Sequence, residues 1–172
     1  MTIKDSGSRT EFETGAVRDV QDDKGRCDLM PLRVIFKFYR TLGQVSVDEK
    51  DEFQYVFFHL ANWKYDGETD WLHLALRDFS DCVFDTYDDM FLEVSMHFKQ
   101  GAEKYGEYNW QKGIPTHSYL DSAVRHLLKV IRADSDERHD RAFVWNIMCL
   151  IWTLENKPEL DDVRHDGKED EE

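Results

Sequence analysis

The sequence predicts an all-α protein, a helical bundle with a non-helical N-terminal arm. Glycine and proline punctuate short-strand architectures, and the 172 residues contain only nine Gly and three Pro. Apolar residues recur instead at helical spacing. The hydrophobic fraction of 41%, with eleven Phe, seven Tyr and five Trp, is enough to build the core of one domain.

The chain divides into three parts by composition. Residues 1–10 are expected to be a flexible N-terminus, and residues 11–157 a single helical domain. Residues 158–172 are rich in carboxylates and are expected to form an acidic, disordered tail. The alternatives for this tail are an interaction segment or a mimic of DNA.

The first helix is expected at about residues 47–64. Ser46 and Glu49 have the spacing of a capping box, and an apolar stripe from Phe53 to Leu60 follows at helical spacing. The residues before this helix, up to Arg26 in particular, are expected to form an extended arm or turn region because glycines punctuate them.

Two further helices are expected before a structured loop. A short one follows Gly67, and a longer one carries an apolar stripe from Tyr87 to Ala102 and ends near Gly106. Two glycines and a proline predict a loop over residues 106–116.

The last two helices carry the clearest hydrophobic patterns. Ser118 has the position of an N-cap for a helix whose apolar seam runs from Leu120 to Val130. The final helix is expected to begin near Asp134–Ser135, with Glu137 completing a cap. Apolar residues on two of its faces predict a central position.

Charge and cysteine usage exclude several classes of protein. The formal net charge is −14, from 36 acidic and 22 basic residues, so a nucleic-acid partner is not expected. Cys27, Cys82 and Cys149 form neither a CxxC motif nor an even disulfide framework. No stretch is apolar enough to span a membrane, and no signal peptide is evident. We expect a cytoplasmic protein without a membrane partner.

A first polar cluster surrounds the predicted loop. A carboxylate, two cations, an amide and two aromatic faces come together there, from Glu103, Lys104, Tyr105, Asn109, Trp110 and Lys112. Aromatic faces can stack on a base, amides can read its edge, and a lysine can contact phosphate. The alternative is an ordinary helix end with the tryptophan packed in the core.

A second cluster lies in the segment YLDSAVRHLL. Asp121 and Arg125 are four residues apart and share a helix face, as do Ser122 and His126. A carboxylate beside a histidine can bind a divalent cation or act as an acid–base pair. The alternative is a surface ion pair beside a partly buried histidine.

A third cluster lies in the segment DERHDRAFVWN. His139 and Asn146 are seven residues apart and therefore share a helix face, and the asparagine lies in a hydrophobic run where it needs hydrogen-bond partners. Asp136 and Glu137 can instead cap the helix. The dipeptide His139–Asp140 alone is only a weak sign of an HD-type metal phosphohydrolase. P-loop, GxGxxG, GxSxG and HExxH motifs are absent from the sequence.

Four ordered segments resemble one known family. They are FETGAVRD with KGRCDLMP (Phe12 to Pro31), HFKQGAEKYGEYNWQKGIP, YLDSAVRHLL, and DERHDRAFVWNIMCLIWTLE. Together they are similar to the phage family of dATP/dGTP diphosphohydrolase N-terminal domains, over about residues 12–38 and 93–155. Residues 40–86 depart from the family pattern and are expected to be a helical insertion, serving as a lid, an oligomer contact or an added function.

The resemblance implies an all-α, nucleotide-associated domain of bacteriophage origin. In the family this domain precedes a separate MazG-like pyrophosphohydrolase domain whose EExxE and ExxD helices hold the metals, and neither motif is clean in this sequence. The polar site residues that the resemblance implies are Lys24, Arg26, Glu103, Lys104, Asn109, Trp110, Asp121, Arg125, His126, His139 and Asn146.

Two functions follow as hypotheses. The first is a metal-dependent pyrophosphohydrolase that converts dGTP or dATP to the monophosphate and pyrophosphate with Mg²⁺ or Mn²⁺. The second is a non-catalytic protein that sequesters a purine nucleotide or a host-defence nucleotide signal. A third interpretation treats the polar clusters as contacts between helices in an oligomer. A homo-oligomer is expected under all three interpretations. The expected roles are metal binding for Glu103, Asp121 and Glu137, catalysis for Lys104, Arg125 and His126, and substrate binding for Lys24, Arg26, Tyr105, Asn109, Trp110, His139 and Asn146.

Overall fold

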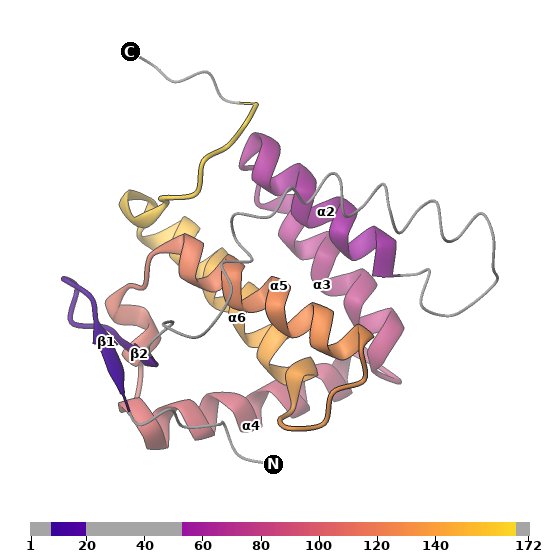
Figure 1. Ribbon diagram of the computed structural model, residues 1–172, viewed down its shortest axis with the longest axis horizontal. Helices are drawn as coiled ribbons and strands as arrows, with labels where there is room; N and C mark the ends of the chain where they lie inside the picture. The colour runs from indigo at the N-terminus through magenta and orange to yellow at the C-terminus, as the bar shows by residue number, and fades with distance from the viewer. Residues whose placement is uncertain (1–7, 20–52, 168–172) are drawn as a thin grey trace. The chain divides into compact units, whose positions relative to one another are not determined.

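The computed structural model describes residues 8–19 and 53–167 (Figure 1). This part of the chain forms two compact units. The first unit comprises residues 8–19 and 90–162, and the second comprises residues 53–89 and 163–167. The described residues form five α-helices, one two-stranded sheet and two short 3-10 helices, so the all-α prediction is confirmed. Within the same ranges, no helix combines the length and apolar character that crossing a membrane requires.

A β-hairpin forms the N-terminal arm of the first unit. Strands β1 (Arg9–Glu11) and β2 (Val17–Asp19) pair antiparallel, with Arg9 opposite Asp19. Gly15 adopts a φ of +77° in the connecting turn, a backbone conformation that glycine reaches without strain. The prediction of a non-helical N-terminal arm is therefore confirmed.

Helix α4 (Tyr87–Tyr105) ends where the sequence predicts. Gly106 follows it with a φ of +93°, a conformation that stops a helix. The buried face keeps part of the predicted stripe. Val94 of the stripe is buried together with Met90, whereas Tyr87 and Phe91 are each 50% exposed. The first turn of the predicted stripe therefore does not pack.

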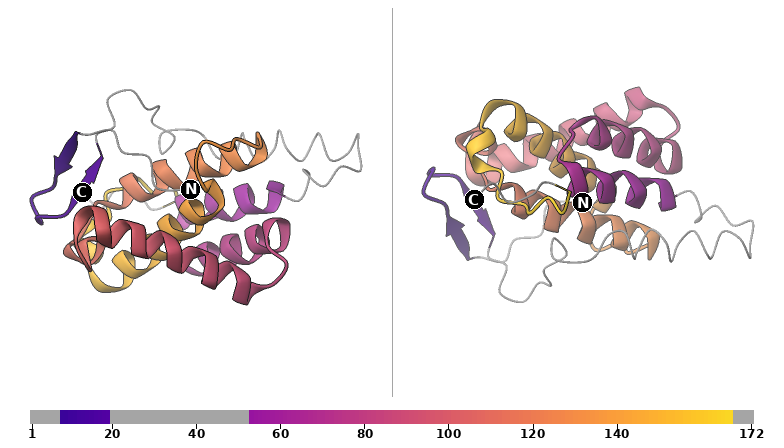
Figure 2. Two further views of the ribbon diagram at one scale, coloured as in Figure 1. Left: turned by 90° about the horizontal axis from the view of Figure 1, so that it is seen from below. Right: turned by 90° about the horizontal axis from the view of Figure 1, so that it is seen from above.

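Helices α5 (Thr116–Ile131) and α6 (His139–Asn156) form the centre of the first unit. They pack against each other along their lengths, and they stay side by side in all the views of Figures 1 and 2. Helix α6 carries ten buried residues, which agrees with a central position. The completely buried side chains of the two helices include Tyr119, Leu120, Ala123, Val124, Leu127, Phe143, Ile147 and Leu150.

Both central helices begin elsewhere than predicted. Helix α5 begins two residues before the predicted cap at Ser118, because Asp162 caps it from a distant part of the chain. The Oδ1 atom of Asp162 accepts the N–H of His117 at 2.9 Å. Helix α6 begins at His139 rather than near Asp134, because the acids of the intervening turn are engaged in contacts with other side chains.

The 3-10 helix η4 (Pro158–Leu160) follows α6 and leads to the capping residue Asp162. These residues belong to the segment that the sequence assigns to an acidic tail. In the structure, residues 158–162 belong to the first unit, because the carboxylate of Asp162 caps α5.

The second unit is built on a helical hairpin. Helices α2 (Phe53–Asp66) and α3 (Asp70–Val83) pack together and are joined through Gly67, whose φ is +76°. The Nε2 atom of His59 lies 2.9 Å from the carboxylate of Asp78, which ties the two helices together. The capping box that the sequence predicts for the first helix lies outside the described residues.

Candidate functional site

Two groups of polar side chains lie inside the first unit. We call His126, Glu137 and His139 the histidine cluster, and Arg18 and Arg125 the arginine pair. The histidine cluster joins the last part of α5 to the start of α6. Of the arginine pair, Arg18 belongs to β2 and Arg125 to α5.

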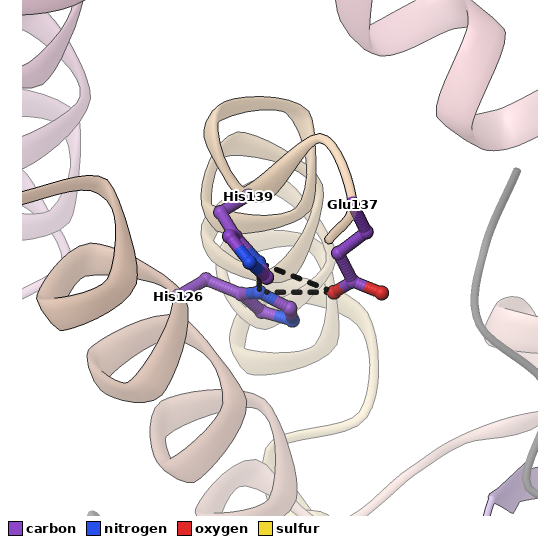
Figure 3. Close-up of side chains that lie close together, drawn as sticks. All are labelled: His126, Glu137 and His139. Carbon is purple, nitrogen blue, oxygen red and sulfur yellow. Dashed lines mark hydrogen bonds and ion pairs between the residues drawn. The ribbon is translucent and has the colours of Figure 1, made fainter. Parts of the chain in front are cut away.

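The histidine cluster brings three potential ligand atoms together. Figure 3 shows the rings of His126 and His139 facing each other, with the carboxylate of Glu137 beside both. The two Nδ1 atoms are 2.9 Å apart, and the Oε1 atom of Glu137 is 3.3 Å from each of them. The three atoms therefore form a nearly equilateral triangle, and all of them lie close enough to share one metal ion.

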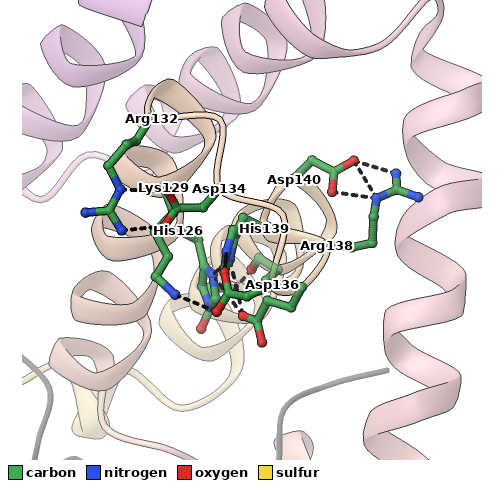
Figure 4. Close-up of polar contacts among 11 residues, drawn as sticks. His126, Lys129, Arg132, Asp134, Asp136, Arg138, His139 and Asp140 are labelled. Carbon is green, nitrogen blue, oxygen red and sulfur yellow. Dashed lines mark hydrogen bonds and ion pairs between the residues drawn. The ribbon is translucent and has the colours of Figure 1, made fainter. Parts of the chain in front are cut away.

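Asp136 orients His139 from the other side of the ring. The Nε2 atom of His139 donates a hydrogen bond to the Oδ1 atom of Asp136 at 2.7 Å, and Lys129 lies 3.3 Å from the same carboxylate (Figure 4). The hydrogen bond from His139 holds the pKa of Asp136 well below its usual range. With its Nε2 proton engaged by Asp136, the ring turns its Nδ1 atom toward the other members of the cluster.

His126 is held in its neutral form. Burial lowers the pKa of His126 well below 6.5, and the nearby His139 and Arg125 lower it further. The charge of Arg18 acts in the same direction. A neutral imidazole is the form that binds metal ions.

Two neighbouring carboxylates, those of Asp134 in the turn and Asp140 in α6, form ion pairs with arginines. Arg132 donates to Asp134 at 2.7 Å, and Arg138 donates to Asp140 at 2.9 Å. Figure 4 shows the carboxylate of Asp140 directed toward Arg138 and away from His139. The His139–Asp140 dipeptide therefore does not place its two side chains at one metal position.

The arginine pair places two guanidinium groups in the interior of the first unit. Arg18 donates from Nη2 to the Oδ1 atom of Asn146 at 2.7 Å and lies over the ring of Tyr119, 5.5 Å from its centroid. Its Nη1 atom is buried and has no hydrogen-bond partner among the described residues. Burial lowers the pKa of Arg18, and the charge of Arg125 lowers it further. Arg125 itself forms an ion pair with Asp121.

His97 of α4 is a further polar residue of this interior that the sequence does not single out. Burial lowers its pKa to about 4, and the charges of Arg141 and Arg18 add to this effect. No chemical motif marks His97 or Arg18. The available signals are their positions in the segments HFKQGAEKYGEYNWQKGIP and FETGAVRD, which carry part of the family resemblance.

Three side chains of the first polar cluster, at the end of α4 and in the loop after it, contact the β-hairpin. The Nζ atom of Lys104 and the hydroxyl of Tyr105 each donate to the carboxylate of Asp19 at 2.9 Å. The side chain of Asn109 bonds the backbone of Val17. These three predicted site residues therefore anchor β2 to the end of α4 and the 3-10 helix η3 (Asn109–Lys112).

Trp110 lies in an aromatic group. Its ring is 5.7 Å from that of Phe98 and 5.0 Å from that of Trp152, centroid to centroid, with edge-on geometry in both pairs. The alternative interpretation of this residue is a tryptophan packed in the core, and the ring does pack against aromatic side chains but is only half-buried.

The predicted metal ligands are not gathered in one place. Only Glu137 lies in the histidine cluster, while Asp121 pairs with Arg125. The side chain of Glu103 is 65% exposed and lies 3.8 Å from Lys99. Lys24 and Arg26, predicted to bind substrate, lie outside the described residues.

Comparison with known proteins connects these residues to a family. Residues 86–163 match the family model described as dATP/dGTP diphosphohydrolase, N-terminal. The predicted resemblance to that family is confirmed. A Salmonella phage PMBT28 protein named dATP/dGTP diphosphohydrolase is 34% identical over 77 residues, which is 42% of this chain and 26% of the relative. The chain thus spans about a quarter of that relative's length. No solved structure matches.

The segment that matches the diphosphohydrolase family contains the whole histidine cluster and Arg125. Arg18 lies outside the segment and reaches this interior only because the hairpin packs against it. The polar interior therefore combines residues of the matched segment with one residue from the N-terminal arm.

Proposed function

We propose that the chain is a nucleotide hydrolase of the dATP/dGTP diphosphohydrolase type, releasing pyrophosphate from dGTP or dATP and leaving the monophosphate. The observation that carries the proposal is the buried guanidinium of Arg18, whose Nη1 atom lacks a hydrogen-bond partner among the described residues. A buried polar group of this kind requires an explanation, and a bound anion supplies one. The name of the phage relative supports a nucleotide triphosphate as that anion.

The two arginines fit a polyphosphate chemically. Arg18 and Arg125 repel each other in the interior of the first unit, and a phosphate group between them offsets this repulsion while accepting hydrogen bonds from Nη1. Guanidinium groups recognise phosphate oxygens with two parallel hydrogen bonds. The triphosphate is therefore the part of the substrate that this interior binds.

In the proposed reaction, a water oxygen bonds to the α-phosphorus, the bond to the bridging oxygen breaks, and the proton of the water passes to solvent. Pyrophosphate leaves with the electron pair of that bond, and the charge that develops on it is stabilised by Arg18 and Arg125. A divalent cation, Mg²⁺ or Mn²⁺, would be held by residues of the histidine cluster, and it would neutralise phosphate charge and activate water. A phage origin and a homo-oligomeric state belong to the same proposal.

The test is product analysis with the full chain. We expect dGTP and dATP, incubated with Mn²⁺ or Mg²⁺, to yield monophosphate and pyrophosphate faster than dCTP and dTTP. Arg18→Gln is expected to lower kcat/KM at least tenfold, which is about 1.4 kcal/mol. The matched control is Arg164→Gln, whose side chain is 80% exposed in the second unit. Absence of pyrophosphate from all four nucleotides would sink the proposal.

Sequestration of a nucleotide is the second candidate, as an anti-defence function for example. Two observations favour it. The chain matches only 26% of the phage relative, and the predicted ligands Glu103 and Asp121 are already paired with cations. In that case a nucleotide binds without metal and is recovered unchanged after denaturation, and Arg18→Gln abolishes binding. Calorimetry followed by chromatography of the recovered ligand separates this candidate from hydrolysis.

A further inference from the structure

We propose that His126, Glu137 and His139 form a mononuclear metal centre, with Asp136 as a positioning residue. The inference deepens the proposed function, on which any role of the ion in hydrolysis rests. Metal binding itself is measured without a nucleotide, so the metal centre and the proposed hydrolase function can be disproved separately.

The spacing of the donor atoms matches a coordination shell. Ligand atoms bound about 2.0–2.2 Å from one ion are about 3.0–3.5 Å apart in octahedral or tetrahedral geometry. The observed separations in the triangle of His126, Glu137 and His139 are 2.9, 3.3 and 3.3 Å. These separations therefore match those of ligand atoms around one ion, which the two rings would face after turning their Nδ1 atoms toward it.

The donor set selects the kind of ion. Two imidazole nitrogens and one carboxylate oxygen suit Zn²⁺ or Mn²⁺ better than Mg²⁺, which prefers oxygen ligands. Three protein ligands also leave at least one position open for water or phosphate, as in catalytic metal sites.

The hydrogen bond between Asp136 and His139 provides the outer support that metal-bound histidines usually have. It fixes the proton of His139 on Nε2 and leaves Nδ1 for the ion. Without the ion, the Nδ1 atoms of His126 and His139 share a hydrogen bond across 2.9 Å. Metal binding requires both Nδ1 atoms to be free of that proton.

The other acidic group of the turn is less suited to a metal. Asp134, Asp136 and His139 also lie close together, but Asp134 is held by Arg132 through two hydrogen bonds and Asp136 is contacted by Lys129. These contacts offset the carboxylate charges. The histidine cluster is therefore the centre that we assign.

The experiment is a titration of the chelator-treated full chain with Zn²⁺ and, separately, Mn²⁺. Competition with a chromophoric chelator gives the affinity and the stoichiometry. We expect one Zn²⁺ per chain, and at least tenfold weaker binding for Glu137→Gln and His126→Gln. Asp136→Asn is expected to weaken binding by about 10- to 100-fold. Glu107→Gln is the matched control, because its side chain is exposed after the end of α4, and its affinity should stay within twofold.

The visible absorption of bound Co²⁺ provides a second measurement. It would not change if Glu137 and Asp136 only stabilised the fold. This absorption reports the ligands directly, so Glu137→Gln and Asp136→Asn are expected to change the band position or intensity while circular dichroism confirms the fold. If His126→Gln does not fold, the isosteric Glu137→Gln alone decides the question. A wild-type chain that binds no Zn²⁺ or Mn²⁺, or a Glu137→Gln variant with unchanged affinity, overturns the metal centre.

The same variants separate this centre from the proposed function. Stoichiometric metal binding without release of pyrophosphate supports the centre and removes the hydrolase. Hydrolysis that persists unchanged in Glu137→Gln, with no metal bound at the cluster, removes the centre and leaves the hydrolase.

Discussion

The side chain of Asn109 bonds both main-chain polar groups of Val17. Its Oδ1 atom accepts the N–H at 3.2 Å, and its Nδ2 atom donates to the carbonyl at 3.0 Å. The side-chain amide of Asn109 thus makes the two hydrogen bonds to β2 that a neighbouring strand would make. Because Arg18 is the next residue, this pair of hydrogen bonds determines where its guanidinium enters the polar interior.

Asn109→Asp is expected to destabilise the protein and to weaken the binding of dATP and dGTP alike. The carboxylate cannot donate to the carbonyl of Val17, and an unpaired buried acceptor costs about 1–3 kcal/mol. Urea unfolding measures the loss of stability, and calorimetry measures the affinities.

The control for this change is Asn156→Asp, at the exposed end of α6. It should leave both nucleotide affinities unchanged. If Asn109→Asp weakened binding of only one of the two purine nucleotides, Asn109 would read the base, as the sequence pattern suggests, rather than anchor the hairpin.

Lys104→Gln is expected to affect stability more than binding. The Nζ atom lies 2.9 Å from Asp19, and the lysine side chain is only 11% exposed, so its loss leaves a largely buried carboxylate short of one cation. We expect a decrease of about 1–3 kcal/mol in the free energy of unfolding and nucleotide affinity within twofold of wild type.

Lys99→Gln is the matched control, because it lies on the same helix with its side chain 65% exposed. It should change neither quantity. Loss of nucleotide affinity in Lys104→Gln with normal stability would instead support the phosphate contact that the sequence predicts.

His97 is expected to make the protein sensitive to acid. Its pKa falls from 6.5 to about 4 on folding, chiefly through burial, so the unfolded chain binds the proton first. Stability is therefore lost as the pH falls from about 6.5 to about 4. Between pH 7 and pH 5 the loss from this residue is about 2 kcal/mol.

Urea unfolding of His97→Gln at several pH values measures this contribution, and the difference between variant and wild type isolates it from other histidines. The variant should lose less stability than wild type between pH 7 and pH 5. His73→Gln, at an exposed position on α3, is the control. Parallel curves for wild type and His97→Gln would show that the ring titrates normally in the folded state.

Asp162→Ala is expected to loosen the beginning of α5. The carboxylate accepts the N–H of His117 at 2.9 Å and the hydroxyl of Thr116 at 3.2 Å, so its removal should cost about 1–2 kcal/mol. Amide hydrogen exchange in the first turn of α5 should become faster. Asp166→Ala, with its side chain 64% exposed, is the control, and equal exchange in both variants would rule out the capping role.

Local signals predicted the helices, whereas contacts between distant residues decided where some of them begin. The glycine at position 106 predicts the end of α4 because its effect is local. The start of α5 could not be predicted in this way, because the capping carboxylate comes from 45 residues further along the chain.

The same distinction applies to the site. Helical spacing in the sequence identifies His126, His139 and Asn146 as candidates, because these residues share faces of two neighbouring helices. It does not reveal Arg18, which meets Asn146 across 128 residues of sequence. His97 is missed because its altered pKa arises from burial and from charges on other segments.

Arg18 lies outside residues 86–163, the segment that matches the family model, and this has a consequence for comparing relatives. A homologue can retain residues equivalent to 86–163 and still lack the second guanidinium if its N-terminal arm differs. Selectivity for the anion that we propose can therefore diverge by exchange of a short hairpin, while the helices that carry His126 and His139 stay the same.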